Sequence, residues 1–398
     1  SWNANPRDFA PRIGFALTLD PHTVLRGGFG MYYYTPAYNM LQFLMANPPN
    51  FVSVSNTYTF TEPTPVSSLF PQFVAATILQ PFAVAKNMPT PYTEQYNLNL
   101  ERQVTSNLLF SIAYVGNQGK HQSNRMNPNQ AALSPDPTNI TPIQSRRPYP
   151  LIGDVLAQYN VGSSNYNGLQ AKVQQTLAHG LAFLASYTWS RTFDISDCDC
   201  TEYANYFYPK RDYGPAGFDQ PRIISFSYVY ELPFGEGKPF LSNGNGIEKH
   251  LVGGWQINGI TSLSSGIPFS VDAPDFSDTG AHGDYANSTC NGTLPSKRTY
   301  FSWFDTSCYS APLPGAVGDA PKNPLRQQAF RKWDFSLFRN FGLGENRSLQ
   351  LRAEAFNVFN QHTFILTGPA VTTTDANFGG MGASAAARTM QIALKFLF

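Results

Sequence analysis

The sequence predicts an all-β protein: an antiparallel transmembrane β-barrel of about eleven strands with long extracellular loops, forming a single barrel region over residues 1–398. Three observations lead to this fold class. Apolar side chains recur at every second position in many short segments, which is the period of a β-strand. Short and long connections alternate between these segments. Charged residues make up only 13% of the chain, while aromatic residues reach 14%, and soluble domains usually carry roughly 25% charged residues.

The first four predicted strands form two hairpins. Residues 13–19 alternate apolar with small or polar side chains, and the turn DPHT leads into a second strand over about 23–34. A third strand covers 97–101, and the turn TSN leads into a fourth over 108–114. Turns this short indicate antiparallel neighbours, because parallel strands need a much longer crossover.

Seven further strands show the same alternation. They cover residues 169–174, 183–190, 224–230, 255–264, 333–337, 349–355 and 388–398. One face of these strands carries Gln, Asn, Ser, Lys, Arg and Glu, which suits a water-filled lumen. The other face carries Leu, Ile and Phe, with Tyr and Trp toward the strand ends, which is typical of the aromatic girdles of an outer-membrane barrel.

A soluble β-sandwich would also alternate along each strand, so strand length has to separate the two folds. The residues given above are the alternating positions that mark each strand; counted in full, the predicted strands run about 9 to 12 residues, which is enough to cross a bilayer at a tilt. Strands of globular proteins typically have about 5 to 6 residues. The longer strands favour the membrane barrel.

The connections give the barrel its direction. A few residues join the two strands of most hairpins, with a longer link at 233–253, and the hairpins are joined by long loops near 35–92, 117–164, 192–221, 265–332 and 360–387. In outer-membrane barrels the short turns are periplasmic and the long loops extracellular. If the last strand ends in the periplasm, every long loop lies outside the cell.

Composition and motifs exclude several other functions. The net charge is +1 with a pI near 7.6 and no Lys/Arg cluster, so no nucleic-acid partner is expected. Apolar runs are far shorter than the roughly 20 residues of a spanning helix. The six histidines are scattered, and H-E-x-x-H, G-x-S-x-G and P-loop motifs are missing, so we expect neither an enzyme nor a cofactor.

Four cysteines fall in polar segments of the predicted extracellular loops: Cys198, Cys200, Cys290 and Cys308. Disulfides fit an exported chain, and one C-x-C pair with two distant partners is a weak match to a zinc site. Cys290 and Cys308 would close a loop of about 18 residues, which is sterically easy. Cys198 and Cys200 are too close in sequence for an easy mutual bond, so pairing between loops remains open.

The longest loops hold two further sets of candidate residues. Oxygen-rich loops can bind calcium, and the weak candidates are Asp272, Asp275, Asp278 and Asp284. Their spacing does not match an EF-hand, and a solvated acidic loop is the favoured alternative. Aromatic faces suit sugar or peptide ligands, and the candidates are Tyr203, Tyr206, Tyr208, Trp303 and Tyr309. The alternative is that these rings only pack the loops.

The chain closes on RTMQIALKFLF, with apolar residues at Met390, Ile392, Leu394, Phe396 and Phe398. Any lipid-facing last strand would alternate in this way. The terminal aromatic residue is more specific, because the segment then resembles the C-terminal signature of bacterial outer-membrane proteins. That resemblance implies an assembly signal recognised by the barrel-assembly machinery.

Several stretches resemble the C-terminal half of Oar-like TonB-dependent receptors, the type with a carboxypeptidase-regulatory-like N-terminal domain. They are PYTEQYNLNLERQ, AYVGNQGKH, NYNGLQAKVQQ, SYTWSRTFD, LVGGWQINGI and LRAEAFNVFNQHTF, together with the terminal Phe. The resemblance implies a Gram-negative outer-membrane location and a barrel of 22 strands filled by an N-terminal plug that contacts TonB. Neither plug nor TonB-contacting segment is evident, so we interpret the chain as a C-terminal fragment; otherwise it must close as a smaller barrel or pair with another chain.

The same resemblance implies import of a bulky nutrient, such as an oligosaccharide, peptide or chelate. Expected partners are outer-membrane lipid, the barrel-assembly machinery, TonB through the missing N-terminal region, and an unknown ligand. Two alternatives stay open at this point: a passive pore without a plug, and a surface structural or adhesive protein whose barrel anchors its loops.

Overall fold

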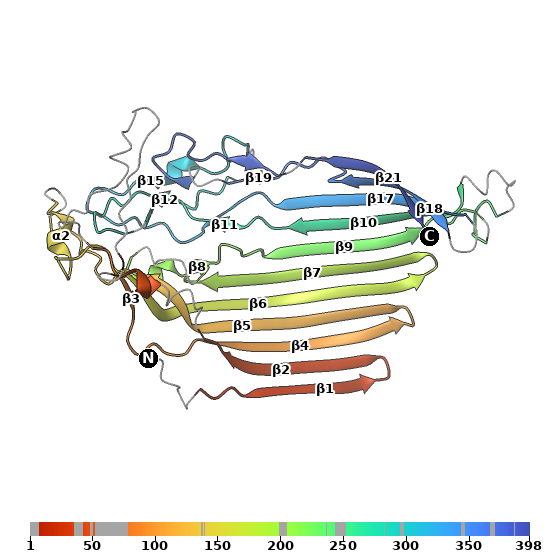
Figure 1. Ribbon diagram of the computed structural model, residues 1–398, viewed down its shortest axis with the longest axis horizontal. Helices are drawn as coiled ribbons and strands as arrows, with labels where there is room; N and C mark the ends of the chain where they lie inside the picture. Colours follow the sequence, from red (N-terminus) through yellow and green to blue (C-terminus); the bar gives the residue numbers. More distant parts are fainter. Residues whose placement is uncertain are drawn as a thin grey trace.

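A computed structural model of the chain describes residues 8–35, 43–47, 51, 79–136, 138, 140–198, 205–235, 237–242, 252–281, 283–294, 298–343, 347–366, 371–385 and 387–398. Its main feature is one sheet of 13 strands (Figure 1). Eleven of them pair in sequence order, each antiparallel to the next: β1 (Arg12–Asp20), β2 (Thr23–Tyr33), β4 (Tyr92–Thr105), β5 (Leu108–Met126), β6 (Leu156–Ala178), β7 (Leu181–Asp194), β9 (Arg222–Glu231), β10 (Trp255–Ser264), β17 (Phe330–Gly342), β18 (Ser348–Phe356) and β21 (Thr389–Leu397).

The remaining elements are short and lie in the connections. The strand β3 (Phe82–Val84) pairs parallel with β6, and β8 (Gly214–Pro215) pairs with β7. The helices are η1 (Phe43–Ala46), α2 (Ile143–Arg146), η3 (Pro209–Asp212) and η4 (Thr306–Cys308). Within the described residues, none of the helices is long and apolar enough to cross a membrane.

The predicted all-β antiparallel fold is confirmed, and each of the eleven predicted strands coincides with one strand of the main sheet. Two strands are longer than expected: β5 has 19 residues and β6 has 23. Both ends of the predicted loop at 117–164 are therefore strand. These extensions carry polar side chains such as Ser123 and Asn160 in place of an apolar row, so the alternation that marks a lipid-facing strand is lost while the backbone ladder continues.

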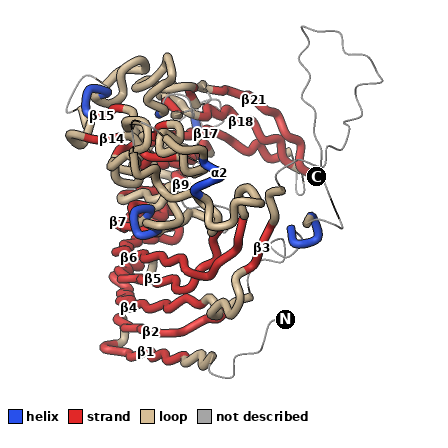
Figure 2. The backbone as a smooth tube through the Cα atoms, turned by 90° about the vertical axis from the view of Figure 1, so that its left-hand side faces the viewer, coloured by secondary structure: helices blue, strands red, loops and turns tan. Residues whose placement is uncertain are grey.

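The two ends of the sheet differ as predicted. The turns after β1, β4 and β6 lie at the end of the sheet that also holds the C-terminus, and the long connections gather at the opposite end (Figure 1). Seen from the side, the sheet curves from β1 to β21 like part of a barrel wall (Figure 2). It does not close within the described residues, because β1 and β21 each pair on one side only.

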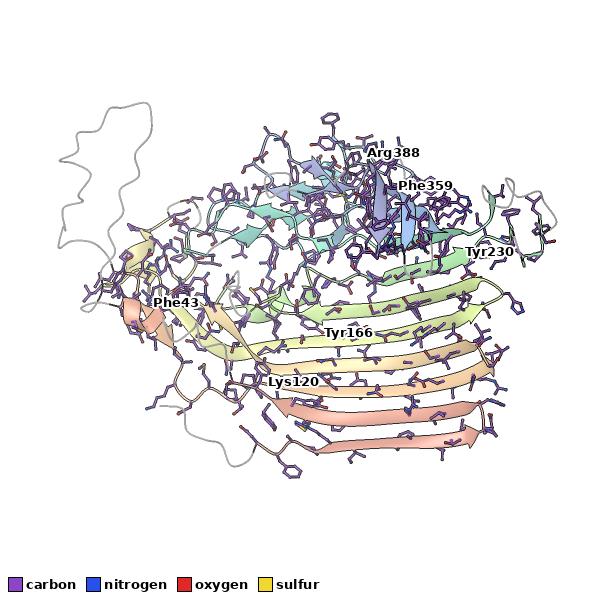
Figure 3. All side chains as sticks on the ribbon, turned by 45° about the vertical axis from the view of Figure 1, so that its right-hand side comes forward. Phe43, Lys120, Tyr166, Tyr230, Phe359 and Arg388 are labelled. Atoms are coloured by element: carbon purple, nitrogen blue, oxygen red, sulfur yellow. A yellow bond between two sulfur atoms is a disulfide. The ribbon has the colours of Figure 1, made fainter. Side chains whose placement is uncertain are left out.

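Strand register divides the sheet into an apolar and a polar face, since directly paired residues share a face. One row of partners is apolar until its last member: Leu17, Leu25, Leu100, Ile112, Ala171, Tyr187, Ile224, Leu263 and Arg331. The adjacent row is mostly polar: Thr18, Val24, Glu101, Ser111, Lys172, Ser186, Ser225, Ser262 and Lys332. Side chains project from both faces along the strands (Figure 3).

The apolar face is uncovered. Ile13 is 72% exposed, and Ile392 is 81% exposed. A β-sandwich would bury this face under a second sheet, but the other sheets among the described residues are two-stranded and lie in the connections. A single curved sheet with one apolar face is the wall of a membrane barrel.

The buried hydrophobic core lies outside this wall, in the long connections. We call residues 265–329 and 360–385, as far as they are described, the loop cap. Four small sheets build it: β11 (Pro268–Phe269) with β16 (Leu325–Arg326), β12 (Asp272–Ala273) with β13 (Asp284–Tyr285), β14 (Asn287–Ser288) with β15 (Tyr309–Ser310), and β19 (Phe364–Ile365) with β20 (Ala383–Ser384). Its buried cluster includes Val271, Trp303, Phe304 and Met381.

Candidate functional site

The polar face of the wall carries charged side chains in neutralising pairs. Arg26 and Glu101 lie 2.6 Å apart on neighbouring strands. Lys332 and Asp334 are 2.8 Å apart on β17, and other polar residues of this face exchange side-chain hydrogen bonds, as Gln350 Nε2 does with Asn340 Oδ1 at 2.8 Å. The pairs are partly exposed, so water screens them and each adds little to stability. The face is therefore a hydrated surface of balanced charge, suited to polar solutes.

The loop cap is held by aromatic packing around Phe304. The ring centroids of Phe269, Phe378 and Tyr309 lie 5.7, 5.4 and 5.9 Å from that of Phe304. The pairs with Phe378 and Tyr309 are edge-to-face, and such pairs stabilise beyond the area they bury, by about 0.5 to 1.5 kcal/mol per pair. The predicted loop is thus a small folded unit with its own core.

The aromatic ligand candidates divide between this core and the surface. Trp303 and Tyr309 are nearly buried, and Trp303 Nε1 donates to the Arg326 carbonyl at 2.8 Å. They pack the loop, which is the alternative foreseen for these rings. Tyr206 is half-buried, whereas Tyr208 is 60% exposed and keeps a face for a ligand. Tyr203 lies outside the described residues.

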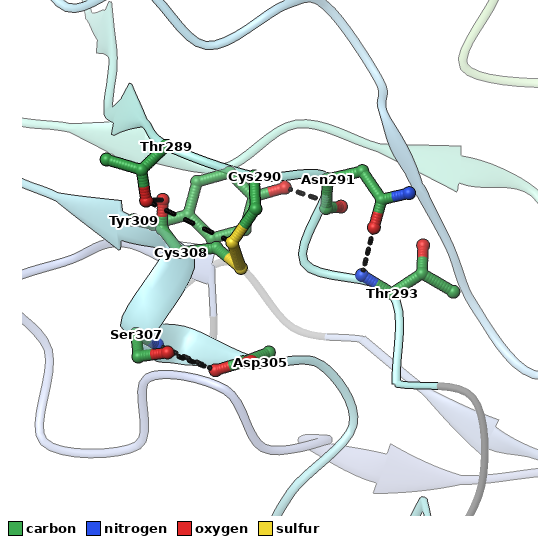
Figure 4. Close-up of a disulfide and its surroundings, with 8 residues drawn as sticks. All are labelled: Thr289, Cys290, Asn291, Thr293, Asp305, Ser307, Cys308 and Tyr309. Atoms are coloured by element: carbon green, nitrogen blue, oxygen red, sulfur yellow. Dashed lines mark hydrogen bonds between the residues drawn. A yellow bond between two sulfur atoms is a disulfide. The ribbon is translucent and has the colours of Figure 1, made fainter.

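One disulfide closes a loop within the cap. Cys290 and Cys308 are bonded, with their Cα atoms 5.1 Å apart and 18 residues of separation (Figure 4). This bond excludes pairing of either residue with the cysteines of the preceding loop. Cys198 is also disulfide-bonded, and Cys200 lies outside the described residues.

The four acidic calcium candidates do not converge. Asp278 pairs with Arg146 at 2.6 Å, and Asp275 accepts a hydrogen bond from the Gly280 amide at 2.9 Å. Burial raises the pKa of Asp272 and of Asp284 to about 6, so the expected solvated acidic loop is wrong for these two residues. Across the described parts of the chain, no group of three or more His, Cys, Asp or Glu could hold a metal ion.

Buried charge pairs tie the cap to the loop between β7 and β9. Lys322 Nζ lies 2.7 Å from Asp194 Oδ1, and Arg326 lies 2.5 Å from Asp219, whose side chain is fully buried. The Tyr285 hydroxyl donates to Asp212 at 2.9 Å, and burial raises its pKa. Removing one partner of such a pair leaves an uncompensated charge, so these contacts fix how the loops sit on one another.

A third loop joins the same assembly. Gln130 Nε2 donates to Thr279 Oγ1 at 2.9 Å, and Arg146 reaches Asp278 from helix α2. The sequence gives no signal for these links, because each connects isolated polar residues across more than 100 positions. The loop cap and these two further loops together form one folded unit at the end of the wall that carries the long connections.

The last strand completes the apolar face. Met390, Ile392, Leu394 and Phe396 of β21 pair with Ala355, Ala353, Leu351 and Leu349 of β18, and Phe398 is 95% exposed just beyond the strand. Their register is that of a lipid-facing edge strand. Their role as an assembly signal remains a prediction.

An uncovered apolar face, a hydrated polar face and a folded external cap together define a barrel protein of the outer membrane. The chain belongs to the outer membrane beta barrel domain family, whose model matches residues 1–391. It is accordingly located in the outer membrane of a Gram-negative bacterium. No curated protein sequence matches the chain.

Comparison with solved structures finds similar proteins at low sequence identity. The outer membrane transporter YddB from Escherichia coli is 12% identical with a TM-score of 0.50, and the match covers 94% of this chain but 38% of YddB. The ferripyoverdine receptor of Pseudomonas aeruginosa is 10% identical with a TM-score of 0.46, covering 98% of this chain and 32% of that one. The ferric yersiniabactin uptake receptor FyuA from Yersinia pestis is 10% identical with a TM-score of 0.45, covering 97% and 36%. The chain thus spans well under half the length of these proteins.

Proposed function

We propose that this chain is the C-terminal half of the 22-stranded barrel of an Oar-like TonB-dependent receptor, which imports a bulky nutrient such as an oligosaccharide, peptide or chelate without changing it chemically. One observation carries the proposal: a mostly polar row from Thr18 to Lys332 runs beside the apolar row across nine strands. Such a wall separates lipid on one side from a hydrated interior on the other.

Strand direction supports a barrel larger than eleven strands. Backbone groups left unpaired in hydrocarbon cost several kcal/mol each, so the free edges of β1 and β21 need partners. As the first and eleventh members of an alternating series, these two strands run in the same direction. Closing the barrel on itself would require one parallel pair in an otherwise antiparallel wall. An even total of strands, as in the resembling family, removes that conflict.

The remaining partners follow from this assignment. TonB would act through a region N-terminal to this chain, and the barrel-assembly machinery would recognise the strand that ends at Phe398. The ligand would meet the loop cap first, where Tyr208 is exposed, and then the polar face with its paired charges. No metal or catalytic group is needed for such passage.

A surface adhesive protein is the second candidate, favoured by the cap's own core and its buried pairs such as Lys322 with Asp194. A rigid exterior would serve attachment as well as capture. A passive pore is the third possibility, with the same wall and no energy coupling.

The test uses cells that express the complete reading frame. Fluorescent oligosaccharides, peptides and ferric chelates of graded size are supplied with and without a protonophore, and in a strain lacking TonB. The proposal predicts internalisation of at least one large solute that stops when either energy source or TonB is removed. Uptake that continues without energy would indicate a passive pore, and surface retention without internalisation would indicate an adhesive protein.

A further inference from the structure

A groove on the apolar face lies at the extracellular ends of β9, β10 and β17. It has a volume of about 420 Å³ and is lined by Ile224, Leu263, Trp333, Arg222 and Arg331. Arg331 lies level with Leu263 and Ile224 in the register, and Arg222 lies two residues outward of Ile224. Register places all five on the apolar face: Ile224 pairs with Leu263, Leu263 with Arg331, and Arg222 with Trp189 of β7. Two guanidinium groups therefore stand on the side of the wall that faces lipid.

The height of Arg222 in the membrane follows from its place on β9. Arg222 is the first residue of the strand and Tyr230, eight positions on, pairs with Leu181 beside the short turn. Eight steps of about 3.3 Å span about 26 Å along a strand, or about 20 Å across the membrane at a tilt of about 40°. The apolar band of such barrels is about 25 Å tall, so Arg222 lies near its outer edge. Trp189, 56% exposed, pairs with Arg222 and marks the same interface.

A polar hollow continues the groove upward. It has a volume of about 370 Å³, shares Ser265, Ala329 and Arg331 with the groove, and is lined above them by Gln328, His362 and Arg298. Arg298 belongs to the loop cap and its guanidinium carbon lies 5.4 Å from the Trp303 ring centre. The polarity therefore changes from apolar to cationic and hydrogen-bonding in the outward direction.

Within the part of the chain that the structure describes, the two arginines have no protein counterion. Among the described residues, no ion pair involves Arg222 or Arg331, whereas nearby Arg326 and Arg191 both pair with Asp219, at 2.5 and 3.5 Å. A guanidinium at the edge of hydrocarbon is costly unless it meets an anion or water. Its planar donors match the oxygens of a phosphate.

We propose that this groove binds a phosphate-bearing lipid of the outer leaflet. An acyl chain lies on Ile224, Leu263 and Trp333, the phosphate lies between Arg222 and Arg331, and the polar head reaches toward Arg298. The surface offers apolar side chains for the acyl chain, two guanidinium groups for the phosphate and the adjoining polar hollow for the head. A second copy of the chain fits less well, because a symmetric contact would bring the two arginine pairs together. The proposal rests on the lipid-facing assignment and is independent of transport.

The test measures lipid bound to the complete detergent-solubilised protein by native mass spectrometry. The probes are lipid A carrying two phosphates and the same lipid after enzymatic dephosphorylation. We expect the phosphorylated form to bind at least tenfold more tightly. The R222Q/R331Q variant should lose that preference, R222K/R331K should keep part of it, and K332Q should bind like the wild type, since Lys332 is adjacent in sequence but lies on the polar face. Heat-modifiable migration in SDS gels reports whether each variant is folded.

Three results would overturn the proposal. Equal affinity for the phosphorylated and dephosphorylated lipid would show that the groove does not recognise phosphate. This comparison needs no variant. Unchanged binding by folded R222Q/R331Q would show that the two arginines do not bind the phosphate. Displacement of the lipid by an excess of inorganic phosphate, or a dimer that forms without lipid, would assign the groove to a free anion or to a second copy.

Discussion

The buried pair of Lys322 and Asp194 gives the sharpest test of the loop cap. The two groups lie 2.7 Å apart with side-chain exposures of 9% and 3%, and Asp197, at 3.6 Å from the lysine, is 41% exposed. Replacing Lys322 by Met removes the cation and leaves Asp194 buried without its main partner. Breaking a buried pair in this way costs about 3 to 5 kcal/mol. The cap should therefore open far more often in K322M.

The magnitude sets the assay. When opening is fast relative to cleavage, proteolysis follows the population of the open form. A cost of about 3 kcal/mol corresponds to a population change of roughly 150-fold, since about 1.4 kcal/mol is a factor of ten. Protease added to outer-membrane vesicles should cleave the loop cap of K322M roughly 150-fold faster than that of the wild type. The strands should stay protected by lipid.

Two further variants make the result specific. R191M removes a guanidinium that is 55% exposed and lies 3.5 Å from Asp219, which keeps Arg326, so its cost should stay below about 1 kcal/mol. D194N/K322M removes both charges and should recover most of the resistance, because a neutral buried pair avoids the uncompensated carboxylate. If K322M were as resistant as the wild type, or no more sensitive than R191M, the account of buried charge pairs joining the loops would be refuted.

Three other perturbations have defined outcomes. Replacing the bonded cysteines (C290S/C308S), which are 18 residues apart, should destabilise the cap by about 3 kcal/mol on the chain-entropy estimate, measured by the same proteolysis; unchanged resistance would contradict this. The pKa values of Asp272 and Asp284 are raised to about 6 by burial, so the folded cap binds more protons than the unfolded one between pH 4 and 6, and its stability should fall as pH rises through that window and level off above it. The D272N variant should flatten that fall, and a cap that becomes more stable toward neutral pH would reverse the sign. Introducing L394K on the apolar face should destabilise the barrel by about 2 to 4 kcal/mol at mid-bilayer depth, whereas Q391K on the polar face should have little effect on the heat-modifiable folded fraction; equal effects would mean the faces are misassigned.

The barrel wall could be predicted from sequence because its signal is local. Each strand alternates on its own, as Ile13, Phe15 and Leu17 do in β1, and the short turns fix antiparallel order. The wall meets lipid and water directly, so the side chains report their surroundings without reference to distant residues. The same logic failed for the outer parts of β5 and β6, where buried polar side chains such as Asn124 and Asn160 stand in place of an apolar row, so the alternation is lost.

The loop cap could not be predicted because its contacts are long-range and aperiodic. Gln130 meets Thr279 and Lys322 meets Asp194 across connections without repeating pattern. Trp303 and Tyr309 looked like surface rings from composition alone, and only their neighbours show that they are buried. Arg222 and Arg331 lie just outside the predicted segments 224–230 and 333–337, and their significance depends on register, which brings them to one groove on one face.

The central claim is that the apolar face of the wall contacts hydrocarbon while the polar face contacts water. Spin labels placed singly at successive positions 97–101 of β4 in the complete protein, in its native membrane, test it directly. The account predicts that labels at Leu98 and Leu100 collide with dissolved oxygen and those at Asn97, Asn99 and Glu101 with a water-soluble nickel chelate, in a strict two-residue period. Chelate accessibility at both faces, or protection of Leu98 and Leu100 from both reagents, would contradict it.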